Sequence, residues 1–473
     1  MYSLALLAFI SSLLALFLTP LWRNLCRRWG WVDRPGGERR LHSLPVPRVG
    51  GVPILAAYLG ALGLLMASPF AGGNLVQSGL PVAWRILPAA VLVFAVGLAD
   101  DLHGVKPWHK LAAQFTAGYL AYWAGVQITA VAGFALPAWL SLPATLLWLA
   151  GCSNAFNLID GVDGLGAGAA LFATVTILLG ALLQDNVALA LATVPLGGAL
   201  LGFLRYNFNP ASIFLGDSGS LTLGFLLGCY GVLWSQKSAT VLGMTAPLMA
   251  LAVPLLDTAI AMARRFLRGR PLFEADAAHI HHRLLARGLT PRRAVLLLYG
   301  TCGLAAGLSL LSSLAHGQSK GLIIVLFCAA AWIGVQHLGY MEFGTAGRML
   351  MGGAFQRHLA SQLALQAFEA AIGKAQTEEE RWRAVREACA KFGFSRAELR
   401  WAGRRFSEEL AEVNGNPCWS IEIPLGAEGY LRLDRCFGAE AVPTVLVPFA
   451  EALHKRLTHD SAAAEPLARR ARA

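Results

Sequence analysis

A series of long apolar runs, which fills the first 340 residues, constrains this chain more than any other feature. Most runs are near the ~20 residues that a helix needs to cross the hydrocarbon layer of a membrane. None alternates like a strand, and a spanning helix satisfies its own backbone hydrogen bonds. Only 14% of residues are charged and 56% are hydrophobic, which argues against an ordinary soluble domain. We predict eleven spans, at 3–21, 49–68, 86–100, 111–125, 139–152, 168–184, 187–204, 221–235, 244–264, 294–314 and 321–340.

The basic residues between these runs predict their orientation. No Lys or Arg precedes the first run, and Arg23, Arg27 and Arg28 follow it, so we expect a retained span rather than a cleaved signal peptide. Because positive residues stay in the cytoplasm, we expect the N-terminus outside and the C-terminus in the cytoplasm. The loops that this topology makes cytoplasmic carry 17 Lys and Arg, whereas the opposite loops carry only Arg85, Lys237 and Lys320.

The net charge of +11 agrees with this picture, since basic cytoplasmic loops attract anionic lipid headgroups and anionic substrates. Nucleic acid is a poor alternative partner, because the basic residues adjoin membrane spans and no nucleic-acid module is visible. The eight cysteines predict no disulfide framework, and no pair has metal-site spacing.

The composition changes after Tyr340, and we divide the chain there. Residues 1–340 form the membrane domain, 341–376 a helical linker, 377–460 a cytosolic α+β domain and 461–473 a disordered tail. Helices are expected at 354–374, 378–392 and 443–458, with Thr377 capping the second. CWSIEI and YLRLD alternate like strands, with Gly426 and Gly429 between them. This order resembles part of a GAF-type sensory domain. The predicted fold class is an all-α polytopic membrane protein with a small C-terminal α+β domain.

Polar clusters stand at four junctions between apolar runs, and the predicted topology puts all four on the cytoplasmic side. Charged groups at the edge of a hydrocarbon layer are costly and usually functional. The clusters are the pair Asp100-Asp101, NAFNLIDGVDGLGAG (154–168), FNPASIFLGDSGS (208–220) and HIHHRL (279–284).

The acidic clusters favour a hard metal ion. Their carboxylates and amides supply oxygen ligands, which suit Mg²⁺ or Mn²⁺ working together with substrate phosphates. These ligands are Asp100, Asp101, Asp160, Asp163 and Asp217, with Asn154 and Asn157. Helix capping is the alternative for each of them, with roughly even odds for any single one. Capping alone is a weak explanation for five carboxylates on one face.

The remaining polar residues also have two interpretations each. His279, His281 and His282 could form a zinc site, but no cysteine is near; contact with phosphate, aided by Arg283, is the better interpretation. Lys110, nine residues after Asp101, is either an interfacial lysine or a phosphate ligand.

Together these motifs resemble the polyprenyl-phosphate N-acetylhexosamine-1-phosphate transferases over about residues 1–340. The aspartate pair and the downstream Lys110 match, NxxNxxDGxDGL matches from Asn154 to Leu165 without a gap, and GDxGS matches at Asp217. The basic loop at 33–51, which ends in a glycine pair, is also similar. The HIHH order is similar to the WecA/TagO branch, whereas the MraY branch typically carries three consecutive histidines.

The resemblance implies transfer of an N-acetylhexosamine 1-phosphate from a UDP-sugar to undecaprenyl phosphate at the cytoplasmic face of a bacterial inner membrane, feeding cell-envelope glycan synthesis. It implies Mg²⁺ as the cofactor and GlcNAc as the sugar. Asp217 would be a metal ligand with Asn157 beside it, and Asp100 and Asp101 would be catalytic acids, in one step or through a covalent intermediate. The implied substrate-binding residues are Lys110, Asn154, Asn157, Asp160, Asp163, His279, His281, His282 and Arg283.

Two other functions stay open. An MraY-type enzyme would use UDP-MurNAc-pentapeptide. A transporter or flippase would carry intramembrane acids as well, but such proteins often show internal repeats and midplane sites, which this sequence lacks. A homodimer and a partner or ligand of the C-terminal domain are also open.

Overall fold

The structure, a computed structural model, describes residues 2–33, 45–67, 81–131, 134–236, 244–267, 279–315, 317–338, 354–401, 403–411, 417–425, 429–436 and 447–454. The predicted tail at 461–473, Gly426 and most of the first basic loop lie outside these ranges. The chain divides into two compact units, Met1–Tyr340 and Met341–Ala473, which are treated separately below.

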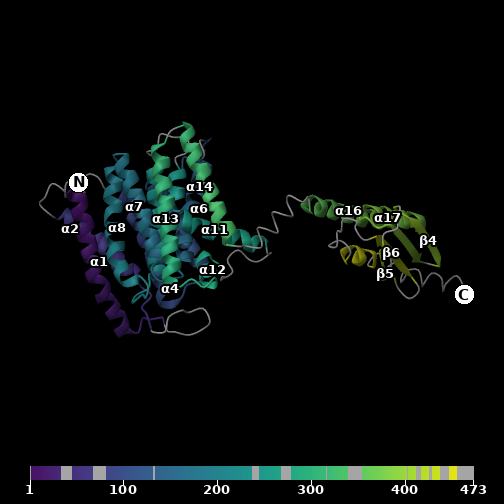
Figure 1. Ribbon diagram of the computed structural model, residues 1–473, viewed down its shortest axis with the longest axis horizontal. Helices are drawn as coiled ribbons and strands as arrows, with labels where there is room; N and C mark the ends of the chain where they lie inside the picture. The colour runs from purple at the N-terminus through teal and green to yellow at the C-terminus, as the bar shows by residue number, and fades with distance from the viewer. Residues whose placement is uncertain are drawn as a thin grey trace. The chain divides into compact units, whose positions relative to one another are not determined.

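The first unit is a bundle of helices (Figure 1). A two-stranded hairpin, β1 (Ala130–Val131) with β2 (Phe134–Ala135), accompanies them. The helices are α1 (Tyr2–Trp29), α2 (Gly51–Met66), α4 (Pro81–His103), α5 (Pro107–Trp123), α6 (Ala138–Ile159), α7 (Leu165–Leu183), α8 (Val187–Asn207), α9 (Gly216–Gln236), α10 (Thr245–Ala250), α11 (Ala252–Leu267), α12 (Ile280–Ala286), α13 (Pro291–Leu314) and α14 (Gly317–His337).

Eight helices in the described part of the chain are long and apolar enough to cross a membrane: α1, α4, α6, α7, α8, α9, α13 and α14. The other predicted spans coincide with α2 (16 residues), α5 (17 residues) and a segment divided at Leu251 into α10 and α11. The helical, multi-span character is therefore confirmed, while the count of eleven and the orientation of the termini stay predictions.

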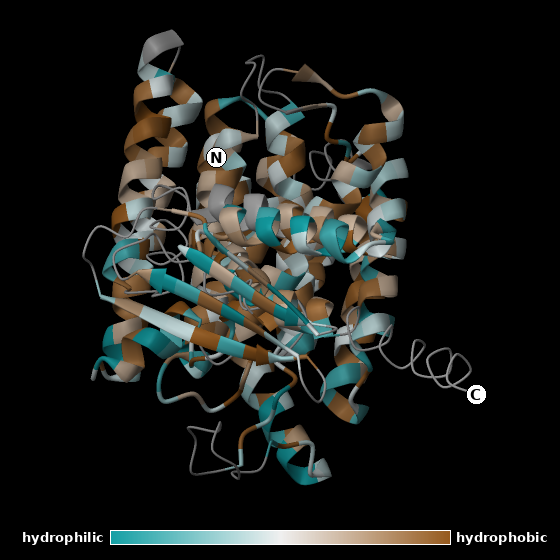
Figure 2. Cartoon of the chain, turned by 90° about the vertical axis from the view of Figure 1, so that its right-hand side faces the viewer, coloured by the Kyte–Doolittle hydropathy of each residue, from teal (hydrophilic) through white to brown (hydrophobic). Residues whose placement is uncertain are grey.

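Helix α9 is the most buried of these spans and lies at the centre of the bundle. Small residues let neighbours approach it, as expected for helices packed in a membrane. A side chain at Gly224 of α9 would strike the backbone of Cys152 in α6, and one at Gly97 of α4 would strike the backbone of Asp217. Large apolar side chains such as Phe17, with 66% of its surface exposed, cover the outside of the bundle. In Figure 2, brown hydrophobic residues recur along its helices.

Backbone hydrogen bonds join the start of α2 to the start of α9. Gly50 and Gly51 donate to the carbonyls of Phe214 and Leu215, at 3.0 and 3.1 Å, and Phe214 donates to Pro47 at 2.8 Å. The short segment before α2 is thereby fixed against the turn that precedes α9.

The second unit contains a four-stranded antiparallel sheet in the order β4-β3-β6-β5. Leu399, Leu431 and Leu433 of the sheet form a core with Phe368 and Val385 of two helices. The elements are α16 (Ala354–Lys374), α17 (Glu378–Lys391), β3 (Arg396–Trp401), β4 (Arg404–Glu409), β5 (Cys418–Pro424) and β6 (Tyr430–Cys436).

Several sequence predictions for this unit are confirmed. Helices α16 and α17 and strands β5 and β6 lie where expected, residues 447–454 are helical, and Thr377 closes a capping box with Glu380. Strands β3 and β4 were missed because RAELRW and RRFSEE are too charged to show simple alternation. Helix α16, inside the range predicted as a linker, packs into the core of the unit. The GAF-type resemblance stays a prediction.

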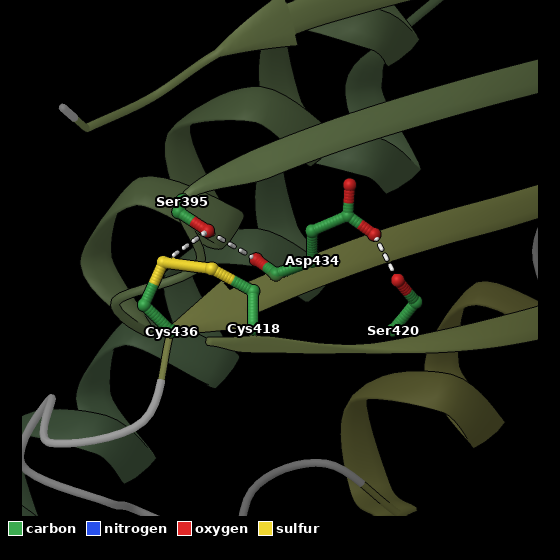
Figure 3. The surroundings of a disulfide bond; sticks show 5 residues. All are labelled: Ser395, Cys418, Ser420, Asp434 and Cys436. Atoms are coloured by element: carbon green, nitrogen blue, oxygen red, sulfur yellow. Dashed lines mark hydrogen bonds between the residues drawn. A yellow bond between two sulfur atoms is a disulfide. The ribbon is translucent and has the colours of Figure 1, made fainter. Parts of the chain in front are cut away.

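One cysteine pair corrects the expectation that the cysteines form no disulfide. Cys418 and Cys436 stand directly opposite each other on β5 and β6 and form a disulfide bond, whereas the other six cysteines are free. Figure 3 shows this bond beside Ser395, whose hydroxyl donates to the carbonyl of Asp434 at 2.9 Å. The pairing depends on the strand register, which a separation of 18 residues does not reveal by itself.

Candidate active site at one end of the bundle

Asp101, in the last turn of α4, holds the start of α9. Its buried carboxylate accepts the backbone N–H of Asp217 at 2.7 Å and of Ser218 at 2.9 Å. The first N–H groups of a helix have no partner within the helix, and a negative charge there is favourable. Gly216 adopts a φ of +73°, and a side chain on it would meet Arg48 and Asp101, so only glycine suits this turn.

Asp217, the predicted metal ligand, lies between two cations. Its Oδ1 accepts from Arg48 Nη2 at 2.6 Å, and its Oδ2 accepts from Lys110 Nζ at 3.0 Å. Asp217 is almost fully buried, whereas about half of the Arg48 side chain is exposed. Arg48 also stands 3.6 Å from Asp101 Oδ1, measured from Nε. The structure thus brings two acids from α4 and α9 together with two bases from other segments.

Asp100 makes different contacts from its neighbour. Its Oδ1 accepts the N–H of Val105 at 2.7 Å, and its Oδ2 lies 3.3 Å from Lys110 Nζ. Lys110 therefore bridges Asp100 and Asp217. Asp101 thus caps α9, whereas Asp100 binds the turn that follows α4. Both also belong to a charged cluster with Arg48, Lys110 and Asp217.

The two asparagines face the same end of the bundle from α6. Asn157 Nδ2 donates to Ser220 Oγ at 3.0 Å, three residues beyond Asp217. Asn154 Nδ2 donates to Gln114 Oε1 at 2.6 Å. The amide side chains therefore connect α6 to the first turn of α9 and to α5.

Asp160 and Asp163 occupy the turn between α6 and α7. Burial raises the pKa of Asp160 well above its ordinary value; Arg48 opposes this shift, while Asp217 and Asp101 add to it. Asp163 Oδ2 accepts from Asn209 Nδ2 at 3.1 Å and from the N–H of Ala211 at 2.9 Å. Burial thus favours the neutral form of Asp160. Asp163 fixes the segment that precedes α9.

The histidines reach this turn from α12. His281 is buried, and a side chain on Gly161 would strike its ring. Among the residues that the structure describes, neither ring nitrogen of His281 has a hydrogen-bond partner. Burial lowers the pKa of His281 to about 3, so the ring is neutral at ordinary pH. His282 lies against it, with ring centroids 4.3 Å apart. Arg283 donates from Nη1 to the carbonyl of Leu338 at 3.3 Å.

The donor set fits Mg²⁺ in its chemistry. The acids provide hard oxygen ligands, and Mg²⁺ is usually bound through one or two carboxylates together with substrate phosphates rather than by a complete protein cage. In the residues that the structure describes, no three His, Cys, Asp or Glu side chains form a preassembled metal site. The prediction assigns Asp217 and Asn157 to the metal. The Asp217 carboxylate already has two positively charged neighbours, Arg48 and Lys110.

Four residues of this region were not predicted as site residues: Arg48, Gln114, Ser220 and Asp257. Arg48 had a signal, since it lies in the basic loop that carries the resemblance. Asp257 had one too, because it is a single acid within an apolar run. Gln114 and Ser220 had none that distinguishes them from ordinary polar residues of a helix.

This arrangement defines a class: a membrane-type helical bundle with an acid- and base-rich site at one end. The model of glycosyl transferase family 4 matches residues 83–235, which include all five aspartates predicted for the site.

The chain is similar to the probable undecaprenyl-phosphate N-acetylglucosaminyl 1-phosphate transferase of Bacillus subtilis (strain 168). The two are 35% identical over 301 residues, covering 62% of this chain and 80% of that protein. It is 36% identical over 333 residues to the decaprenyl-phosphate N-acetylglucosaminephosphotransferase of Mycolicibacterium smegmatis, covering 64% and 80% of the two chains.

The undecaprenyl-phosphate alpha-N-acetylglucosaminyl 1-phosphate transferase of Escherichia coli (strain K12) is 26% identical over 343 residues, covering 69% of this chain and 87% of that protein. The chain belongs to the polyprenyl-phosphate N-acetylhexosamine-1-phosphate transferase family, as its motifs predicted.

Proposed function

We propose that this protein transfers N-acetylglucosamine 1-phosphate from UDP-N-acetylglucosamine to undecaprenyl phosphate and releases UMP. Electrons from an acceptor phosphate oxygen form a new bond to the β-phosphorus of the donor, and the bond from that phosphorus to the UMP oxygen breaks. The lipid product is a polyprenyl-diphosphate-linked sugar. We also propose that the site faces the cytoplasm of a bacterial inner membrane.

The observation that carries the proposal is the assembly around Asp217. Arg48 and Lys110 stand within 3.0 Å of its carboxylate, and Asp101 fixes the helix start that carries it. A phosphoryl transfer from a pyrophosphate donor needs positive charge close to the bridge that breaks, and a fixed frame to align the two phosphates. Arg48 and Lys110 would supply the positive charge, and the fixed start of α9 would supply the frame. Both lie at one end of an apolar bundle, the level at which the phosphate of a membrane lipid is expected.

The roles of individual residues follow from their surroundings. Lys110, between Asp100 and Asp217, is suited to contact a phosphate, and the half-exposed Arg48 is suited to the same task. Asp100 has less buried surroundings than Asp101 and is the better candidate to interact with the acceptor phosphate. His281 lies beside Gly161, and no described residue bonds to either of its ring nitrogens, so it is suited to hold a donor group. Asp163 would lie near the uracil of the donor.

Asp217 and Asn157 would hold Mg²⁺. When bound, the ion would neutralise the charge that develops on the pyrophosphate as the bridge breaks.

The test is UMP release by the purified full-length protein in nanodiscs that contain undecaprenyl phosphate. UDP-N-acetylglucosamine should give UMP and lipid-linked sugar in equal amounts, and omission of the lipid phosphate should abolish both. Release of UDP in place of UMP, or product without lipid phosphate, would refute the proposal.

A donor panel separates the related alternatives. UDP-MurNAc-pentapeptide tests the MraY-type function, and UDP-GalNAc and UDP-QuiNAc test other sugars. A flippase should release no nucleotide from any donor, while it would move a labelled lipid across the membrane.

A further inference from the structure

A buried carboxylate on α11 holds the histidine segment. Asp257 has 1% of its surface exposed. Its Oδ2 lies 2.9 Å from His279 Nδ1, and its Oδ1 accepts the N–H of Ile280 at 2.8 Å. Both contacts cross 22 or 23 residues, so they tie the start of α12 to α11.

The chemistry of this pair determines where the histidine carries its proton. A carboxylate oxygen is an acceptor, and Oδ2 of Asp257 lies within hydrogen-bond distance of Nδ1, so we assign the hydrogen of His279 to Nδ1. Nε2, on the opposite edge of the ring, is then the nitrogen that can accept a hydrogen bond from a ligand when the ring is neutral. A carboxylate that orients a histidine in this way acts on the ligand only through the imidazole.

The anchored His279 is followed by His281, which reaches the turn that carries Asp160 and Asp163. The rings of His279 and His281 stack, with centroids 5.8 Å apart and an interplanar angle of 4°. His281 packs against Gly161, beside Asp160, and its nitrogens have no hydrogen-bond partner in the described part of the chain. Asp257 is therefore the contact that fixes the start of α12, while His281 is the residue at the site.

A buried carboxylate is costly to maintain, because desolvation of the charge must be offset by its hydrogen bonds. Two bonds to α12 supply that compensation here. An apolar residue at this position would pack α11 in the bundle without orienting a histidine, so packing alone does not explain the acid.

We propose that Asp257 is a positioning residue for sugar-phosphate transfer: it anchors the segment His279–His282 and sets the tautomer of His279. The proposal rests on the proposed function, since His281 of this segment is assigned to the donor substrate there.

Asp257→Asn is the central variant. Its amide oxygen can accept from Ile280, and its NH₂ group can donate to Nδ1 if His279 moves its hydrogen to Nε2. The tether then persists while the tautomer is reversed. We expect the melting temperature to stay close to that of the wild type and kcat/KM for the UDP-sugar to fall about ten-fold or more. Asp257→Glu should recover part of the loss, because it restores an acceptor for Nδ1.

A double-mutant cycle identifies the route of the effect. In His279→Asn, the side-chain amide can replace Nδ1 as a donor to Asp257 but provides no counterpart of Nε2. If Asp257 acts through His279, Asp257→Asn should cause little further loss of kcat/KM in the His279→Asn background. A loss of the same factor in both backgrounds, or unchanged kcat/KM in Asp257→Asn, would overturn the proposal.

A readout independent of turnover is hydrogen–deuterium exchange of the peptide that covers 279–286. Asp257→Ala should accelerate its exchange and leave that of α7 unchanged. The matched control is Ser309→Ala, which removes a buried 2.7 Å bond from Ser309 Oγ to the carbonyl of Ala246 elsewhere in the bundle. This control should retain kcat/KM and normal exchange at 279–286. Unchanged exchange in Asp257→Ala would contradict anchoring, whereas an inactive wild type with accelerated exchange in Asp257→Ala would refute only the proposed function.

Discussion

Replacing Asp101 by Asn should destabilise the bundle far more than the same change at Asp100. The two carboxylate oxygens of Asp101 each accept one N–H at the start of α9. Asparagine retains one oxygen, so one N–H faces an NH₂ group. A hydrogen bond to a charged acceptor is worth about 1.5–3 kcal/mol, and a buried donor without a partner costs about 1–3 kcal/mol. The two free energies describe the same broken contact in part and do not simply add, so we expect the free energy of unfolding to fall by about 3 kcal/mol.

Asp100→Asn should leave the bond to the turn after α4 intact, because Oδ1 can still accept from Val105. It removes the ion pair with Lys110, and partly exposed pairs contribute only about 0.2–1 kcal/mol. We therefore expect Asp100→Asn to retain stability, and we expect both variants to lower turnover, by different factors.

The measurement combines thermal unfolding in nanodiscs with UMP release. A melting temperature of Asp101→Asn close to that of the wild type would show that the two bonds at α9 contribute nothing measurable. Equal destabilisation by both changes would contradict the distinction between the two oxygens. Normal turnover in both variants would reduce the pair to helix caps.

Three further predictions concern other parts of the chain. Asp217→Asn should abolish transfer and weaken the Mg²⁺ dependence while the protein stays folded, because an amide binds a hard cation less well; normal turnover over a Mg²⁺ titration would contradict the role. A chain truncated after residue 345 should retain UMP release in detergent, since every recognised motif precedes that point; a folded but inactive product would assign part of the site to the second unit. Hydrogen bonds from Arg405 and Tyr430 lower the pKa of Glu398 in the folded second unit. Its stabilising contribution is therefore full above the ordinary value of 4.5 and is lost as the pH falls below it, so Glu398→Gln should flatten the acid-dependent unfolding of this unit.

The sequence predicted the helical bundle well because apolar runs near 20 residues have few alternatives to a spanning helix. It could not predict the break at Leu251, where one apolar run becomes α10 and α11, because composition does not change there. In the second unit, alternation located β5 and β6 but not β3 and β4. The charged side chains of β4 lie on an exposed edge, where alternation is not required.

The site was predicted as a set of motifs, and the structure relates them to one another. Asp100, Asp101, Lys110 and Asp217 do come together. Arg48 was missed because the sequence signal marks its basic loop as a whole, and only the fold distinguishes this arginine from the others in the loop. Asp257 was missed because its partners, His279 and Ile280, adjoin it only after the chain has turned back. The assignments of catalytic, substrate-binding and metal residues stay predictions.

The bond between Asp101 and the start of α9 also has a consequence for biosynthesis. The two partners are 116 residues apart, so α4 leaves the ribosome well before Asp217 is made. Until then the Asp101 carboxylate has neither its N–H partners nor a low-dielectric shell, and it must stay hydrated at the membrane surface. Insertion of α9 both completes the central helix of the bundle and buries this charge. A nascent chain stopped before α9 should therefore keep the end of α4 accessible to water-soluble reagents, and a full-length chain should not.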